Sequence, residues 1–151
     1  MSIAENEKIA RLWFEVLWRQ PDPGRLIEEI IHPDYQPVKS LFAKKGAQQF
    51  REEIKQGLVS FPDAKSEIID MCALEDRVWV RYKFNGTHKG KFLGFPATGN
   101  TVEIEGVTIL YIKDHRVIDT WSSLPLFDML TILGLAPRID MLKDYLRWSP
   151  K

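Results

Sequence analysis

Three side chains that could do chemistry occupy alternate positions near the end of the chain: Asp119, Trp121 and Ser123. Alternate residues of a strand share one face, so these three are predicted to lie side by side. Asp119 is the only carboxylate on that face. In an apolar cavity its pKa would rise, and it would then act as a base near neutral pH. A carboxylate at the rim, paired with Arg116 or Lys113, is the alternative interpretation.

Aromatic side chains are the other candidates, because a ring can hold a flat apolar ligand and an indole N–H can donate a hydrogen bond. Ordinary core packing explains Trp121 equally well, and a half-buried sheet position explains Tyr111. Asp128, about one helical turn beyond the strand, is a second candidate carboxylate beside Asp119. The predicted ligand contacts are Trp13, Leu17, Tyr35, Phe92, Phe95, Tyr111, Trp121, Ser123 and Phe127.

The residues that bind metals are scattered along the chain. His32, Cys72, His88 and His115 have none of the short spacings of metal sites, so we predict no metal. The glycines of GKFLGFPATG follow a strand but do not open a helix, which argues against nucleotide binding. We therefore expect no cofactor. His88 lies among glycine-rich bends, and we predict a structural hydrogen bond there.

Hydrophobic periodicity places helices towards both ends of the chain and strands between them. The third helix has a buried stripe of Phe50, Ile54 and Leu58, and its charged residues, Glu53 among them, are expected to face water. Gly106, inside the third strand, indicates a β-bulge. The expected helices span 3–19, 26–31, 46–60, 126–133 and 138–148, and the expected strands span 65–73, 77–87, 101–113 and 116–124.

The last two strands are predicted to form a hairpin, because Asp114–His115 fits a two-residue turn. Antiparallel pairing from this turn places Tyr111 opposite Ile118 and Thr108 opposite Trp121. This register decides which residues of the last strand face the helices.

Helices followed by a meander of long strands predict an α+β domain. We expect a cone-shaped, curved antiparallel sheet with the N-terminal helices packed on its concave face, a cystatin-like α+β barrel. Residues 1–136 are expected to form this domain, and residues 137–151 a C-terminal helical extension of it. The interior of such a cone is a suitable place for a small ligand.

Charge and cysteine content restrict the partners. The chain has 21 basic and 21 acidic residues, so a small apolar molecule is a more natural partner than nucleic acid or a membrane. Cys72 is the single cysteine, and no apolar signal segment precedes it, which predicts a cytoplasmic location. Trp79 shares the outer sheet face with Arg77, Arg81 and Lys83, and such a partly apolar face predicts a homodimer.

Three segments of the chain resemble the SnoaL-like polyketide (ester) cyclases, which belong to the superfamily of nuclear transport factor two. The segments are FPDAKSEIID, DRVWVRYKFNGTHKGKFLGFPATGN and RVIDTWSSLPLFDMLTILG, and the resemblance covers Ala4 to Leu135. It implies the cone-shaped fold, sheets that meet in a homodimer, and aldol ring closure without a metal or organic cofactor. The matching motif residues are Phe61, Pro62, Asp63, Asp76, Arg77, Val78, Val80, Arg81, Gly86, Thr87, His88, Gly90, Phe92, Gly94, Pro96, Thr98 and Gly99.

The chain departs from the pattern of this family at the residues that do the chemistry. The resemblance implies a catalytic Asp four positions after Trp121, but Pro125 stands there, and a frequent family histidine would fall near Val38. Neither side chain can exchange a proton. Two functions stay open: a cofactor-free acid–base enzyme (cyclase, isomerase or hydrolase) acting on a small apolar carbonyl compound, or a non-catalytic ligand-binding or protein-interaction module that has lost the catalytic Asp.

Overall fold

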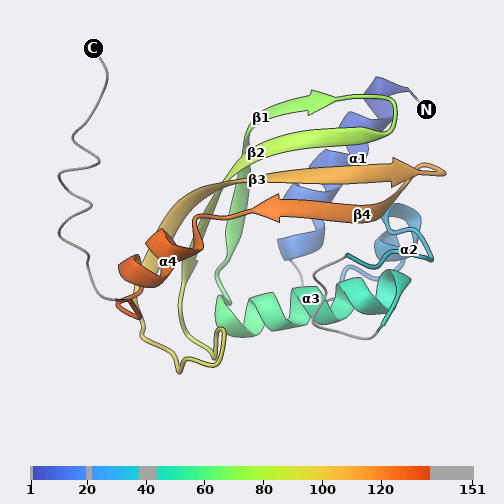
Figure 1. Cartoon of the computed structure of the whole chain (residues 1–151). Helices are drawn as coiled ribbons and strands as arrows, with labels where there is room; N and C mark the ends of the chain where they lie inside the picture. Colours follow the sequence, from blue (N-terminus) through green and yellow to red (C-terminus); the bar gives the residue numbers. More distant parts are fainter. Residues whose placement is uncertain (1, 20–21, 38–43, 137–151) are drawn as a thin grey trace, which may run out of the picture.

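The computed structural model describes residues 2–19, 22–37 and 44–136 (Figure 1). Within these ranges helices come first, four strands follow, and a short helix comes last. The elements are α1 (Ile3–Glu15), a single 3₁₀ turn η1 (Leu17–Arg19), α2 (Leu26–Ile30), α3 (Gly46–Ser60), β1 (Lys65–Ala73), β2 (Arg77–Thr87), β3 (Thr101–Lys113), β4 (Arg116–Ser123) and α4 (Leu126–Ile132).

The predicted strands agree with these bounds to within one residue, and the first helix differs most. It was expected to continue to Arg19, but α1 ends at Glu15, and the chain tightens into η1 after Val16, whose φ is −119°. The predicted helix at 138–148 and the extension at 137–151 lie outside the described residues. None of the described helices is long and apolar enough to cross a membrane.

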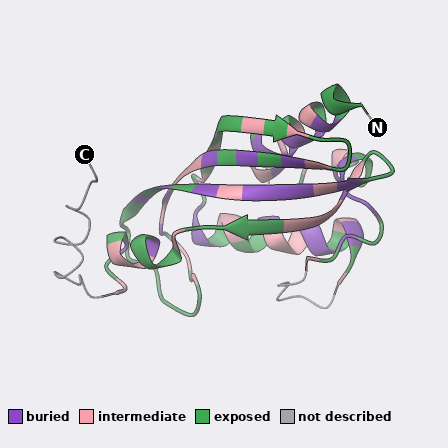
Figure 2. Ribbon diagram, turned by 45° about the horizontal axis from the view of Figure 1, so that its top comes forward, coloured by how far each residue is buried: buried purple, intermediate pink, exposed green. Residues whose placement is uncertain are grey.

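The four strands form a meander in the order β1-β2-β3-β4, and each neighbouring pair is antiparallel. In Figure 1 the sheet curves over α1 and α3. Along β2, Val78, Val80 and Tyr82 are buried while Trp79 and Arg81 are exposed, an alternation visible in Figure 2. One face of the sheet is therefore covered by the helices, and the predicted α+β fold with N-terminal helices on an antiparallel sheet is confirmed.

Aromatic rings join the helices to the covered face of the sheet. The rings of Trp13 in α1 and Phe50 in α3 have centroids 4.4 Å apart, and Phe14 lies 4.8 Å from Tyr82 of β2. Burial of a large apolar side chain stabilises a fold by about 1.5–3 kcal/mol. This cluster therefore fixes α1 and α3 relative to β2.

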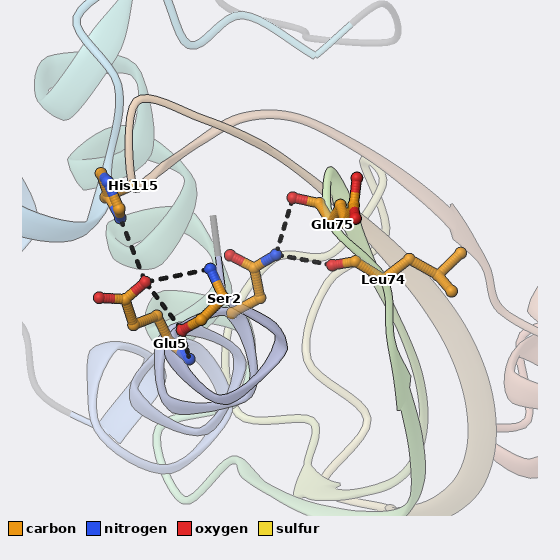
Figure 3. A network of polar contacts seen from close by, with 6 residues as sticks. Ser2, Glu5, Leu74, Glu75 and His115 are labelled. Carbon is orange, nitrogen blue, oxygen red and sulfur yellow. Dashed lines mark hydrogen bonds and ion pairs between the residues drawn. The ribbon is translucent and has the colours of Figure 1, made fainter.

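A polar network fixes the start of α1 (Figure 3). Ser2 and Glu5 form a reciprocal capping box. The buried amide of Asn6 donates to the carbonyls of Leu74 (2.7 Å) and Glu75 (3.1 Å), which belong to the β1–β2 turn. These two hydrogen bonds satisfy the buried amide N–H groups of Asn6 and attach α1 to the edge of the sheet.

A β-bulge between Tyr111 and Ile112 changes the register of the last hairpin. The turn at Asp114 and His115 forms as predicted, with positive φ at both residues. The bulge, however, places Tyr111 opposite Asp119, and Thr108 opposite Ser122. The predicted pairing of these residues is therefore wrong by one position, and a shift of one residue moves every side chain of a strand to the other face.

Gly106 does not mark a bulge, and that prediction is also wrong. The pairing of β2 with β3 runs without interruption through Tyr82 and Gly106. A Cβ atom at Gly106 would lie 2.7 Å from Leu124 Cδ2 and 3.1 Å from Tyr82 Cζ. Glycine is therefore used here to let two side chains approach the strand closely.

The glycine-rich segment between β2 and β3 is organised by His88, which is fully buried. The His88 Nδ1 lies 3.0 Å from the hydroxyl of Thr98, and the backbone N–H of Thr98 donates to the same nitrogen. The His88 ring packs against Phe61 at a centroid distance of 5.6 Å. The structural turn hydrogen bond predicted for His88 is confirmed.

Candidate active-site cavity

A cavity of about 320 Å³ lies between α1, η1, α3 and the covered face of the sheet. Pockets that hold small ligands have volumes of about 300–1,000 Å³, so this cavity is at the lower end of that range. Its aromatic lining residues are Trp13, Phe14, Trp18, Tyr35, Tyr82 and Phe84. Such rings favour a flat apolar ligand.

The cavity contains one carboxylate among its described lining residues, Glu53 of α3. The hydroxyl of Tyr35 donates to Glu53 Oε2 at 3.1 Å, and Gln49 Nε2 donates to Oε1 at 2.7 Å. Burial raises the pKa of Glu53 above its ordinary value, although both hydrogen bonds oppose this shift. A carboxylate of this kind can take up a proton near neutral pH more readily than a solvated one.

Tyr35 lies between Glu53 and the sheet. It is fully buried, and burial, with a further contribution from the charge of Glu53, raises the pKa of its hydroxyl. A hydrogen bond with Thr120 of β4 acts in the opposite direction. Tyr35 therefore stays protonated and holds the Glu53 carboxylate in a fixed orientation.

Hydroxyl groups line the wall formed by the strands. Thr108 Oγ1 of β3 lies 2.8 Å from Ser122 Oγ of β4. Burial raises the pKa of the neighbouring Tyr82 hydroxyl, and Thr108 opposes this shift. The hydrogen bond between Thr108 and Ser122 uses one of their two hydroxyl protons. One proton is then left to donate to an oxygen atom of a ligand in the cavity.

Comparison with known proteins shows the family of this chain. The family model of SnoaL-like polyketide cyclases matches residues 8–133. The chain belongs to this family. No curated protein sequence matches the chain.

Three solved structures illustrate the likeness. TsrD from Streptomyces laurentii has a TM-score of 0.81 at 21% identity, over 90% of this chain and 99% of TsrD. AclR, a proposed hydroxylase from Streptomyces galilaeus, has a TM-score of 0.71 at 29% identity, over 90% of this chain and all (100%) of AclR. IdmH, a proposed polyketide cyclase from Streptomyces antibioticus, has a TM-score of 0.67 at 25% identity, over 86% of this chain and 98% of IdmH.

The structure brings two of the predicted ligand contacts to the cavity of this SnoaL-like protein. Trp13 and Tyr35 line it, and their contact with a ligand stays a prediction. Leu17, by contrast, is fully buried in the main hydrophobic core and is not among the lining residues. Phe92 packs in a second, separate cluster around Phe61.

The residues predicted on one face of the last strand are not among those that line the cavity. Because of the bulge, Thr120 and Ser122 line the cavity in place of Asp119, Trp121 and Ser123. The predicted position of these three side chains in the cavity wall is therefore wrong. Asp119 Oδ1 accepts a hydrogen bond from the backbone N–H of Thr120, and Trp121 is 46% exposed.

Four other predicted site residues also lie away from the lining. The guanidinium carbon of Arg77 lies over the Tyr111 ring, 5.3 Å from the ring centroid. Both residues are on the face of the sheet opposite to the cavity. Phe95 is exposed in the segment between β2 and β3, and Phe127 and Asp128 are exposed on α4. None of these four is among the lining residues.

Glu53 is the carboxylate of the cavity lining that sequence reasoning missed, because it was assigned to the solvated side of its helix. Gln49, Glu53 and Gly57 follow one another at four-residue spacing beside the apolar stripe of Phe50 and Ile54. Both Gln49 and Phe50 are fully buried, so the covered face of α3 is wide enough to include Glu53. The regular spacing was the available signal, and the polar residue types concealed it.

Pro125, at the position of the family's catalytic Asp, is the N-cap of α4, and its carbonyl accepts a hydrogen bond from the backbone N–H of Met129 at 3.0 Å. Its neighbour Leu124 lines the cavity. The position near Val38 lies outside the described residues. Among the described residues, no group of three or more His, Cys, Asp or Glu side chains is arranged to hold a metal ion.

Proposed function

We propose that this SnoaL-like protein is a cofactor-free acid–base enzyme that acts on a small, largely apolar carbonyl compound in the cavity. Glu53 is the base. The observation that supports this proposal is a carboxylate with a raised pKa in the wall of a mainly aromatic cavity. Glu53 would supply from α3 the carboxylate that the family pattern places at Pro125.

In the proposed reaction the Glu53 carboxylate removes a proton from the carbon next to the carbonyl. The C–H bond breaks, its electron pair forms the enolate, and the negative charge moves to the carbonyl oxygen. The hydroxyl proton that the Thr108–Ser122 pair leaves free would be donated to that oxygen. Tyr35 acts as a positioning residue for Glu53.

The enolate carbon then has two outcomes. It can take the proton back at another position, which is isomerisation, or it can attack a second carbonyl carbon of the same molecule, which closes a ring. Aldol ring closure begins with this proton removal, in agreement with the cyclase description of IdmH.

A non-catalytic ligand-binding module is the second candidate. Pro125, with no proton to exchange at the family's catalytic position, is the observation that favours it. In that case the cavity would retain its ligand, and Glu53 would only hydrogen-bond to it.

Exchange of carbon-bound protons separates these two functions. The probe is 2-acetylnaphthalene in D₂O, and proton NMR follows the loss of its methyl signal. We expect the wild type to accelerate exchange and Glu53→Gln to reduce the acceleration by about a hundredfold or more. Glu52→Gln is the matched control, because Glu52 pairs with Lys44 outside the cavity lining and its loss should leave the rate unchanged.

Two results would contradict the proposal. Exchange that is equally fast in Glu53→Gln would show that another group is the base. A probe that quenches the fluorescence of Trp13 and Trp18 on binding, but gains no exchange, would support the binding module.

Two further proposals concern association and location. We propose that the protein forms a homodimer through the outer face of the sheet, where Trp79 is 44% and Trp121 46% exposed. A cytoplasmic location stays the prediction made from the single cysteine.

A further inference from the structure

Arg19, the last residue of η1, is the only basic residue among the described residues that line the cavity. It follows Trp18, whose ring lies 5.5 Å from that of Phe50 and 3.2 Å from where a Cβ atom of Gly57 would be. Trp18 therefore packs along the face of α3 that carries Glu53. This packing directs the next residue, Arg19, to the rim of the cavity.

The guanidinium of Arg19 has no hydrogen bond or ion pair with any residue that the structure describes. Other arginines of the chain are paired: Arg51 with Glu28, Arg77 with Asp76, and Arg81 with Glu105. Because Arg19 is also exposed, its charge is available to an incoming molecule. A guanidinium binds a carboxylate through two parallel hydrogen bonds.

The two charged groups of the cavity lie at different depths. Glu53 is partly buried and held by Tyr35 and Gln49, whereas Arg19 is exposed. An anionic group of a ligand is repelled by the ionised Glu53 and attracted by Arg19. A ligand with one anionic end would therefore enter with that end at the rim and its uncharged end towards Glu53.

We propose that the substrate of this cavity is a flat carbonyl compound of about two rings that carries a carboxylate, and that Arg19 binds this carboxylate. The cavity volume of about 320 Å³ and its aromatic wall set the size and shape. Arg19 sets the charge. The carbonyl group of this substrate rests on the proposed function. The carboxylate rests on Arg19 alone.

Binding of two matched compounds tests this selectivity. The probes are 2-naphthoate and the uncharged 2-naphthamide, and quenching of the fluorescence of Trp13 and Trp18 reports binding. We expect the wild type to bind the acid about tenfold more tightly than the amide, a preference that added salt reduces. Arg19→Gln should remove this preference by weakening only the acid, and Arg19→Lys should keep part of it.

Arg25→Gln is the control, because Arg25 lies outside the lining of this cavity and its loss should change neither affinity. Three results would overturn the proposal: no binding of either compound by the wild type, an acid preference that survives Arg19→Gln, or an equal loss of acid and amide in that variant. The last would mean that Arg19 is only part of the wall.

Failure of the proposed base role of Glu53 can be distinguished from failure of the carboxylate site at Arg19. If Glu53 is not the base, Glu53→Gln retains proton exchange while the acid preference of the wild type is unaffected. In addition, Glu53→Gln should bind 2-naphthoate slightly more tightly than the wild type does, because the repulsion from the ionised Glu53 is removed.

Discussion

At the scale of single residues, the ionisation of Glu53 links stability to pH. Its pKa is raised in the folded protein, mainly by burial. The contribution of such a group to stability is fully present below the pKa of the unfolded chain and is lost as pH rises through the folded pKa. Glu53→Gln, which keeps the shape and removes the charge, should therefore stabilise the protein more at about pH 8 than at about pH 4.

Thermal unfolding of the wild type and of Glu53→Gln at both pH values measures this difference. Glu52→Gln provides a control of opposite sign, since a hydrogen bond and the charge of Lys44 lower the pKa of Glu52. Its removal should lower the melting temperature at the higher pH only. A change in melting temperature for Glu53→Gln that is equal at both pH values would show that its charge carries no cost in the fold.

Only part of the cavity lining could be predicted from the sequence, and Glu53 belongs to the part that could not. Trp13 and Tyr35 were predicted as cavity residues from their types, and both line it. Glu53 was not, because its charge assigned it to the solvated side of α3, and one of the two side chains that hold it, Tyr35, lies eighteen residues away in the sequence. Local periodicity contains no information about the distant partner.

At the scale of elements, the bulge in the last hairpin decides which side chains reach the cavity. The turn at Asp114–His115 could be read from the sequence, but the bulge occurs where another segment joins β4. Ile31 pairs in parallel with Val117, and the backbone N–H of His32 donates to the Val117 carbonyl at 2.9 Å. A contact between segments so far apart in sequence could not be read from alternation, and the strand face was predicted incorrectly for this reason.

Gly90, a residue of the family motif, joins the β2–β3 segment to the end of α3. The backbone N–H groups of Lys89 and Gly90 donate to the Ser60 carbonyl at 3.0 and 3.2 Å. A Cβ atom at Gly90 would lie 1.9 Å from the Val59 carbonyl oxygen. Because backbone must move to relieve this clash, Gly90→Ala should destabilise the protein by about 2–3 kcal/mol in chemical denaturation.

Lys89→Ala is the control for Gly90, because its side chain is exposed and its backbone N–H is retained. It should change the free energy of unfolding by less than about 0.5 kcal/mol. If Gly90→Ala is as stable as Lys89→Ala, the segment does not dock on α3 as closely as the structure places it.

At the scale of the whole molecule, the two faces of the sheet have separate roles. The covered face, with Val78, Val80 and Tyr82, packs under the helices and forms one wall of the cavity. On the opposite face, Trp79 pairs with Ile109, and Ile109 pairs with Trp121, which forms an apolar row across three strands. Among the described helices, α1 and α3 pack on the other face of the sheet, and in this row Trp79 is 44% and Trp121 46% exposed.

Charge on the outer face favours a second copy of the chain as the partner. Arg81 pairs with Glu105, and Lys83 pairs with Glu103, beside the apolar row. Rotation of a copy by half a turn about an axis through the row would place apolar side chains on one another. It would also bring the positive and negative side chains of one copy opposite the negative and positive side chains of the other. This is the self-complementarity that a twofold interface requires.

We predict that the protein is a dimer in solution and that Trp79→Glu makes it a monomer. The substitution places a carboxylate at one end of the apolar row, where dimerisation would bury it without a partner. Light scattering coupled to size-exclusion chromatography gives the mass of each species. Ile3→Glu is the control, since Ile3 is also exposed, at 51%, but begins α1 on the helical side of the sheet. A wild type that is monomeric, or a Trp79→Glu variant with the mass of the wild-type dimer, would show that this face does not hold the two copies together.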